Sequence, residues 1–468
     1  MGLEIDHLIL SKSLALVDKT HKRVRRIDVA AFPTSASSNA KGMIERTLQM
    51  LGDPDRWSVM SAEALYRALI NLQDFVDRVE ASTSDRISWP FVSYCDQLWR
   101  RLFPNGTSEI FYSVFAEHNY GIHSFSYELE QLLIPLLPPD DIKQAVGEKK
   151  IFCLQIASLE DENLPLYANI GHEFGHALYW DREENIMGAF DNTVADVFSN
   201  IVKQLNNSES ALRCLCALRS MATEIFCDMV GALISGPAFM LSLHEMGWGS
   251  VQRLWSVGLT AKNKSIRAYP SNDFRIDCVK RSLLFTNYIH EVEKHLRKEG
   301  SCPTLTQQSL DFTIGSSMDS LRVSPASDPD AKHIETALLQ ALPNLRNCFS
   351  EFSKDCYSQL LSKERDASVF ETISPEEVAK LLARMDADIL PNIVPNGTLL
   401  GAPASFAAIL NAASLFRIMA LGLTRSTNGK EAVSHDIQKI ERLTAKALEV
   451  SYVQKTFREW EKQPSVKL

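Results

Sequence analysis

The 468-residue chain has no excess of positive charge. Its 58 acidic residues outnumber 49 Lys and Arg, so the formal net charge is −9. Proteins that bind nucleic acids usually present a basic surface, and we therefore expect no nucleic-acid partner. A basic cluster does lie between Lys19 and Arg26. It is short, and a solvated face is the simpler interpretation of it.

Long uninterrupted apolar runs are also missing. The most apolar stretch, residues 402–424, is interrupted by polar side chains, which favours a buried helix over a membrane span. These are Ser405, Asn411, Ser414 and Arg417. The first residues show no positively charged segment followed by a long apolar run, so we expect no signal peptide. The sequence predicts a soluble protein without a membrane partner, located in the cytoplasm.

The nine cysteines lack the paired spacing of a zinc knuckle or a redox motif. They are odd in number and lie mostly in apolar segments, which is typical of reduced, buried thiols, and we predict no disulfides. The chain also lacks a glycine-rich phosphate loop, a Gly-x-Ser-x-Gly elbow, a dinucleotide fingerprint and internal repeats. The sequence signatures of nucleotide binding and serine hydrolysis are therefore absent.

Helical periodicity dominates what the chain does contain, and it predicts a mainly α (α+β) protein. Apolar residues recur at helical spacing in residues 61–81, 91–102, 124–136, 331–362, 375–385, 402–423 and 431–462. The clearest strand pattern, rich in β-branched and apolar residues, is 150–158. A serine-rich connector is expected at residues 33–39, and the polar, acidic residues 181–192 are expected to form a loop beside the cleft.

Composition and pattern divide the chain into four parts. They are an N-terminal helical region (1–147), a core with a small β-sheet (148–300), a linker or exposed loop rich in Ser, Thr, Asp and Pro (301–330), and a C-terminal helical region (331–468). The chemistry described below falls in the second part. The helical flanks could provide an interface for a protein partner.

One segment, residues 171–176 with the sequence GHEFGH, has the spacing of a metal site. Positions four apart on an α-helix differ by about 40° in direction, so His172 and His176 project from one face and could bind one ion. Glu173 lies about 100° round the helix, which suits a general base acting on a water better than a third ligand. The chain has 11 histidines, so this spacing could also arise by chance.

A second apolar segment, residues 221–233, carries two acids one helical turn apart. Burying two carboxylates is costly unless a metal or hydrogen bonds compensate. Zinc held by two imidazoles needs a third protein ligand, and Glu224 is the candidate. Asp228 would then accept a hydrogen bond from a ligand histidine. The alternatives are two partly solvated acids on an amphipathic helix, and Asp191 or Asp196 as the third ligand.

The pattern His172-Glu173-x-x-His176, followed by Glu224-x-x-x-Asp228, resembles the gluzincin type of zinc metallopeptidase. The resemblance covers residues 150–235 and implies a zincin-like catalytic core. It implies Zn²⁺ as the cofactor, bound by the two histidines and Glu224, with Glu173 as the catalytic base. By the same resemblance Asp228 orients a ligand histidine.

The resemblance is incomplete in two places. Thr223 stands where the thermolysin-like pattern has an asparagine, and the two helices are farther apart in sequence, so a close thermolysin relative is not expected. Strand 150–158 precedes the metal helix, as does a strand that pairs with substrate in zinc peptidases, although a plain core strand is an equal alternative.

Residues 269–276 look like the His-Pro segment and arginine that follow the ligand glutamate in some gluzincins, with Tyr269 in place of the histidine. Tyr269 or Arg275 could donate a hydrogen bond to a developing oxyanion or to a substrate carboxylate. The alternative is a helix cap, at Asn272 or Asp273, with a surface ion pair.

The leading hypothesis is a zinc-dependent metallopeptidase, a hydrolase acting on a peptide or protein substrate. Zinc would activate a water, and Glu173 would take its proton and pass it to the leaving amine. A second hypothesis is a peptidase-like zinc-binding module that binds a partner or senses a ligand without turnover, although such a site would not need Glu173. Hydrolysis of a non-peptide amide is a third.

Overall fold

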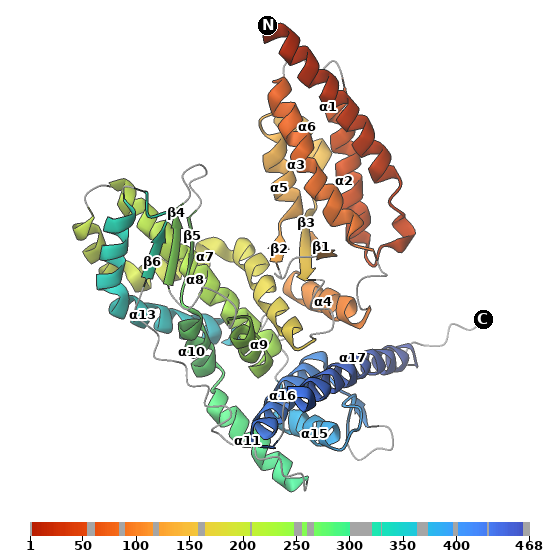
Figure 1. Ribbon diagram of the computed structural model, residues 1–468, viewed down its shortest axis with the longest axis vertical. Helices are drawn as coiled ribbons and strands as arrows, with labels where there is room; N and C mark the ends of the chain where they lie inside the picture. The colour runs from red at the N-terminus through yellow and green to blue at the C-terminus, as the bar shows by residue number, and fades with distance from the viewer. Residues whose placement is uncertain are drawn as a thin grey trace. The chain divides into compact units, whose positions relative to one another are not determined.

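The computed structural model describes residues 2–53, 61–83, 89–115, 121–157, 164–205, 208–247, 255–259, 266–299, 321–328, 330–362, 373–395, 401–427 and 430–461. The protein is mainly helical with small sheets, as the periodicity predicts (Figure 1). It forms two compact units, Met1–Asp161 and Glu162–Leu468. Within the described ranges, no helix is long and apolar enough to cross a membrane.

The first unit is a helical bundle with one small sheet. Its elements are α1 (Gly2–Arg25), α2 (Ser35–Leu51), α3 (Ala62–Glu80), α4 (Trp89–Leu102), β1 (Ser108–Phe115), β2 (Gly121–His123), α5 (Phe125–Leu133), α6 (Pro139–Val146) and β3 (Lys150–Ala157). Its core packs the apolar faces of these helices against the sheet, for example at Val24, Leu72 and Phe125. Residues 35–39 of the expected connector are instead the first turn of α2, because Ala36 and Ser37 are buried with this core.

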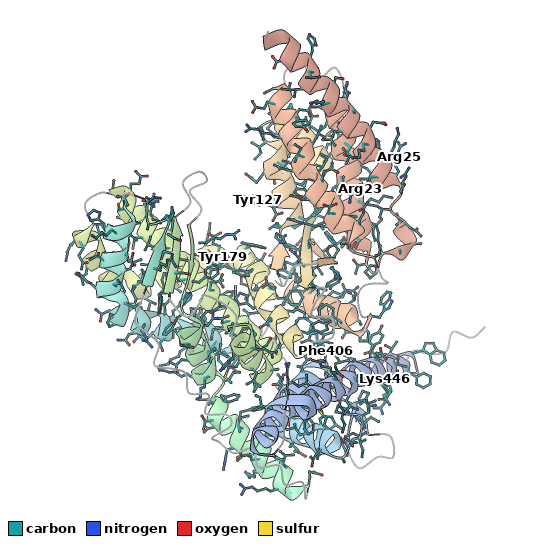
Figure 2. The ribbon with its side chains drawn as sticks, viewed as in Figure 1. Arg23, Arg25, Tyr127, Tyr179, Phe406 and Lys446 are labelled. Carbon is teal, nitrogen blue, oxygen red and sulfur yellow. The ribbon has the colours of Figure 1, made fainter. Side chains whose placement is uncertain are left out.

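The basic cluster of α1 is a partly paired surface. Arg23 turns toward α3, where its Nε donates to Oε1 of Glu80 at 2.8 Å and its Nη2 donates to Oδ1 of Asp77 at 2.5 Å. Arg25 is exposed on the outer side of the helix (Figure 2). The solvated-face interpretation therefore fits the structure.

Strand β3 is the middle strand of the first sheet, whose order is β1-β3-β2. It pairs in parallel with β1 along its full length and antiparallel with β2 at residues 153–155. Both of its edges are therefore occupied at these residues, which leaves no edge there for a substrate strand. The pairing also ties β3 to the first unit, so the boundary falls near residue 161 and not at 147/148 as the sequence analysis expects.

The second unit contains the pattern His172-Glu173-x-x-His176 and the C-terminal helices. Its elements are η4 (Leu164–Asn169), α7 (Ile170–Gln204), α8 (Ser208–Ser235), α9 (Pro237–Gly247), β4 (Trp255–Leu259), β5 (Ile266–Tyr269), α10 (Asn272–Ser282), α11 (Phe285–Lys298), β6 (Leu321–Ser324), α13 (Ala331–Ser362), α15 (Pro375–Asp386), β7 (Ile393–Val394), β8 (Ala402–Pro403), α16 (Phe406–Thr427) and α17 (Lys430–Glu461). Helix α13 packs against both α7 and α8, so the C-terminal region is not separate from the predicted core.

Part of the expected linker, residues 301–330, is a strand. Residues 301–320 lie outside the described ranges, but β6 pairs in parallel with β4 at the edge of a sheet ordered β5-β4-β6. Leu321 and Val323 are buried, while Arg322 and Ser324 alternate with them and are exposed. This short alternation is typical of a half-buried strand, but the polar composition around it obscures the pattern.

The loop expected at residues 181–192 is helical. Helix α7 continues through it to Gln204, and only Arg182 departs from helical backbone angles (φ −129°, ψ 17°). Met187 and Phe190 are buried on one face, and the Phe190 ring stacks on Phe349 of α13 with centroids 5.4 Å apart. The prediction was wrong because the charged residues cover the outer face of an amphipathic helix.

Candidate metal centre

Two glycines allow α7 and α8 to approach closely at the site. A Cβ atom added to Gly175 would lie 2.6 Å from the Cα of Cys227, and one added to Gly171 would lie 2.9 Å from the Cα of Gly231. Non-bonded carbons do not come so close, so this spacing of the helices requires glycine at both positions. The close approach lets acids on α8 reach imidazoles on α7.

Two imidazoles and one carboxylate converge between these helices. Nε2 of His172 lies 3.4 Å from Oε2 of Glu224, and Nε2 of His176 lies 3.9 Å from Oε1 of the same side chain. The two rings are nearly perpendicular, with centroids 4.9 Å apart. Each carboxylate oxygen therefore faces one Nε2 atom, so the structure brings together the three residues expected to bind zinc.

Asp228 holds the outer nitrogen of His172. Its Oδ1 lies 2.9 Å from Nδ1, and the carboxylate is fully buried. A carboxylate can only accept here, so Nδ1–H donates and Nε2 is directed toward Glu224. The contact expected of Asp228 is present, while its role around a bound ion stays a prediction.

A buried arginine from α10 pairs with Asp228. Nε and Nη2 of Arg275 each donate to one Asp228 oxygen at 2.7 Å, and Nη2 lies 3.5 Å from Oε2 of Glu224. Arg275 is only 5% exposed, so it forms no surface ion pair and offers no surface to a substrate carboxylate. The cap of α10 is Ser271, whose Oγ accepts from the backbone N–H of Phe274, and not Asn272 or Asp273.

Hydrogen bonds and opposite charges at the site shift the pKa values of His172, Glu224 and Asp228 toward their ionised forms. Burial by itself would lower the pKa of His172, but hydrogen bonds to Asp228 and Glu224 raise it to about 10. Burial would raise the pKa of both acids, yet the pKa of Glu224 is lowered mainly by His172 and that of Asp228 mainly by Arg275. Burial and the charge of His172 lower the pKa of His176. The two acids are thus held ionised, which favours a cation between Glu224 and the imidazoles.

Glu173 lies on the side of α7 that solvent reaches. Between Ile170 and Trp180, every residue is buried except four: His172, Glu173 and His176 are partly exposed and Trp180 is exposed. We call these four the accessible strip. The charge of Glu173 acts on the pKa of His176. The expected base therefore shares the strip with two expected ligands.

Tyr269 ends β5 close to the acids. Burial raises the pKa of its hydroxyl, and the charge of Glu224 adds to the effect. The adjacent Ala268 is fixed to α8 because Ser220 Oγ accepts from its N–H at 3.0 Å and donates to its carbonyl at 3.2 Å. Ser220 lies one turn before Glu224, so it joins β5 to the site. The sequence carries no signal that would have identified Ser220.

Cys227, for which the sequence predicts only a buried thiol, is a further candidate donor. One donor atom from each of His172, His176 and Cys227 lies within 4.8 Å of the others. The position of Cys227 three residues after Glu224 could have indicated this in the sequence, because residues three apart share a helix face. Burial, then the charges of Glu224 and Asp228, raises the thiol pKa well above its usual value, so the thiol would have to lose its proton before it could bind an ion.

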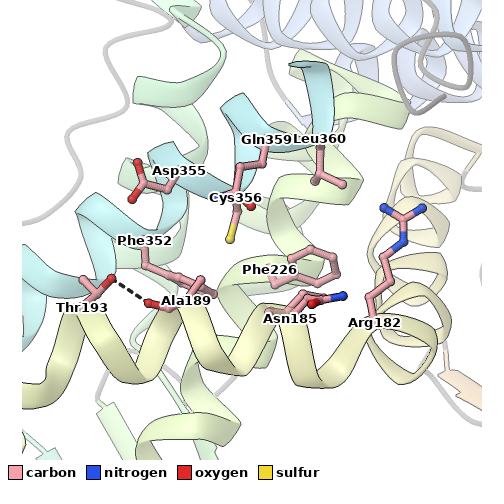
Figure 3. A pocket seen from close by; sticks show the side chains of 11 residues that line it. Arg182, Asn185, Ala189, Thr193, Phe226, Phe352, Asp355, Cys356, Gln359 and Leu360 are labelled. Atoms are coloured by element: carbon pink, nitrogen blue, oxygen red, sulfur yellow. Dashed lines mark hydrogen bonds between the residues drawn. The ribbon is translucent and has the colours of Figure 1, made fainter. Parts of the chain in front are cut away.

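The competing acids lie elsewhere. Oδ1 of Asp191 accepts from Nε of Arg219 at 3.1 Å, and the charge of Asp196 acts on Cys348 of α13. A hollow of about 60 Å³ is lined by residues of α7, α8 and α13, and neither His172 nor His176 is among its lining residues (Figure 3). It is less than half the roughly 150 Å³ of a cavity known to bind benzene. It is therefore too small for a ligand of that size.

No model of a known protein family matches the sequence. No curated protein and no solved structure matches it significantly either.

Proposed function

We propose that the protein is a zinc-dependent metallopeptidase with a zincin-like core of the gluzincin type. The observation that carries the proposal is that the Nε2 atoms of His172 and His176 face the two oxygens of Glu224, while Asp228 holds Nδ1 of His172. Two imidazoles and one carboxylate are the protein ligands of one class of catalytic zinc site, which keeps one position open. The exposed side of the accessible strip suits such an opening.

The residues around the site have distinct roles in this proposal. Zinc, when bound, would supply a Lewis acid and a water activated near neutral pH. Glu173 would take the proton from the nucleophile and return it to the leaving amine. Asp228, held by two hydrogen bonds from Arg275, would keep His172 oriented. The Tyr269 hydroxyl would donate to the substrate carbonyl oxygen.

Substitution of the base tests the reaction. Glu173→Gln should retain one zinc per chain, because Glu173 is not a ligand, and should lower peptide cleavage by about 10²- to 10⁴-fold. Metal content is measured by elemental mass spectrometry, and cleavage with a proteome-derived peptide library. Full activity in the variant would contradict the assignment of the base.

Substitution of the third ligand tests the site. Glu224→Ala should lose zinc, whereas Asp191→Ala should keep it because Asp191 pairs with Arg219. The zinc content of both purified variants, measured in the same way, shows which of the two acids binds the ion. Zinc retained in Glu224→Ala, or lost in Asp191→Ala, would show that the ligand is wrongly assigned.

Cys227 favours a second candidate function, a zinc-binding interaction or sensor module without turnover. With the thiol as fourth ligand the site would be closed, as in structural zinc sites. X-ray absorption separates the two candidates, since a Zn–S distance is about 2.3 Å and Zn–N or Zn–O distances are about 2.0–2.2 Å. The peptidase proposal expects no sulfur neighbour and full zinc content in Cys227→Ser.

The partner proposed for this site is a peptide or protein substrate. An interface on the helical flanks and a cytoplasmic location remain predictions from the sequence.

A further inference from the structure

Trp180 continues the accessible strip beyond the histidines. It is 43% exposed, and its ring centroid lies 6.3 Å from that of His176, with the planes tilted by 30°. It follows Glu173 by seven positions, which places the two within about 20° of each other around the helix. A large aromatic surface is therefore presented to solvent on the same line as the expected base and ligand.

Three acidic residues follow this indole closely in the chain. Asp181, Glu183 and Glu184 are all exposed. Glu184 is four positions after Trp180, a spacing that brings side chains together on a helix. Glu183 makes a contact of this spacing. Its Oε1 accepts a hydrogen bond from the hydroxyl of Tyr179, four positions earlier, at 3.2 Å. This side-chain contact spans Arg182, the residue whose backbone departs from helical angles.

The one basic residue of this segment points elsewhere. Arg182 lines the hollow between α7, α8 and α13 together with Asn185 and Ala189 (Figure 3). The exposed charged residues that follow the indole in this segment are therefore acidic.

We propose that Trp180, Asp181 and Glu184 form a subsite for a cationic side chain, arginine above all, of a peptide bound at the accessible strip. Tryptophan is the best aromatic partner for a cation, and a planar guanidinium can stack on it while donating hydrogen bonds to carboxylates. An extended peptide advances about 3.3 Å per residue, so 6.3 Å from His176 corresponds to about two residues. The inference rests on the proposed function and adds the substrate class, basic peptides.

The test measures peptide binding to the zinc-loaded Glu173→Gln variant by calorimetry, so that turnover does not interfere. The probes are decapeptides of Ala, Gly and Ser in which one Arg is moved through every position. Citrulline then replaces Arg at the best position, because it keeps the planar shape and removes the charge. We expect Arg to bind about 5- to 10-fold more tightly than citrulline.

Four further variants in the same background locate the effect. Trp180→Ala should abolish the preference for Arg over citrulline, and Trp180→Phe should retain part of it. Asp181→Asn combined with Glu184→Gln should reduce the logarithm of the ratio of the Arg and citrulline affinities by about half. Trp460→Ala is the matched control, since Trp460 is an equally large aromatic on α17 with 66% exposure, and it should leave the preference unchanged.

The outcomes separate this inference from the peptidase proposal. Equal affinity for Arg and citrulline, tighter binding of Phe than Arg at the same position, a preference that survives Trp180→Ala, or no peptide binding would each overturn the subsite. Cleavage by the wild type tests the peptidase proposal independently. A Trp180-dependent preference without any cleavage would support the subsite and contradict the peptidase.

Discussion

Arg275 compensates the buried charge of Asp228. Two hydrogen bonds of 2.7 Å join it to Asp228, and both side chains are buried. Removing one partner of such a pair leaves the other charge buried and uncompensated, which destabilises the folded state by about 3–5 kcal/mol. Arg275→Met should therefore lower the free energy of unfolding of the metal-free protein by that amount, as measured in urea.

The double substitution supplies the control for this prediction. Asp228→Asn together with Arg275→Met removes both charges and should recover most of the lost stability. It also removes the orienting carboxylate, so zinc affinity should remain about 10- to 100-fold below that of the wild type. A single variant as stable as the wild type would mean that the pair contributes little.

The protonation of His172 makes zinc binding pH-dependent. Its pKa of about 10 in the folded protein lies above the usual value, so the ring is protonated at pH 7–9, and zinc must displace that proton. The pKa of His176 is lowered, so this ring is already neutral. Zinc affinity should rise about tenfold per pH unit between pH 7 and 9 and level off above pH 10. Competition with a chelator, corrected for the chelator's own protonation, measures the slope, and a flat profile would exclude this coupling.

Spacing along the helices predicts part of the candidate site and could not predict the rest. His172, Glu173 and His176 follow from one helical turn, and Glu224 with Asp228 from another. The ion pair of Arg275 with Asp228 and the hydrogen bonds of Ser220 to Ala268 join residues about 47 positions apart in sequence. No local pattern encodes such contacts, which is why the sequence left Arg275 between a hydrogen bond to substrate and a surface ion pair, and did not predict its buried pairing with Asp228.

At the scale of elements, Gly175 sets the distance between α7 and α8. Gly175→Ala would place a methyl group 2.6 Å from the Cα of Cys227 and should destabilise the protein by about 1–3 kcal/mol, with loss of zinc as the helices separate. Gly188 is the matched control on the same helix, because nothing lies within 4 Å of an added Cβ there. Gly188→Ala should stabilise the helix by about 0.5–1 kcal/mol and keep zinc. Thermal unfolding and metal analysis compare the two, and equal behaviour would contradict the role given to Gly175.

Periodicity predicts elements well where apolar residues alternate regularly with polar ones. The expected helix at 331–362 is α13, and the one at 375–385 differs from α15 by a single residue. Composition was a poorer guide than periodicity. Polar residues at 181–192 and serines at 35–39 suggested loops, yet both segments place apolar or small side chains on a buried face and are helical.

At the scale of the whole molecule, all the residues of the candidate centre belong to the second unit, Glu162–Leu468. The first unit has its own core, formed by residues between Val17 and Cys153. A fragment of residues 162–468 should therefore fold and bind one zinc per chain, while residues 1–161 should fold without binding zinc. Circular dichroism and metal analysis of both fragments test this. An unfolded second fragment would show that its stability depends on the first unit.

The position of Trp180 also gives the protein a built-in optical reporter. Its indole lies 6.3 Å from the ring of an expected metal ligand and is open to solvent. An ion with partly filled d orbitals, such as Co²⁺ or Cu²⁺, quenches tryptophan emission at such short range, whereas Zn²⁺ does not. Exchange of one ion for another could thus be followed in real time by the fluorescence of the unlabelled protein, with Trp180→Phe identifying the share of the signal that comes from the site.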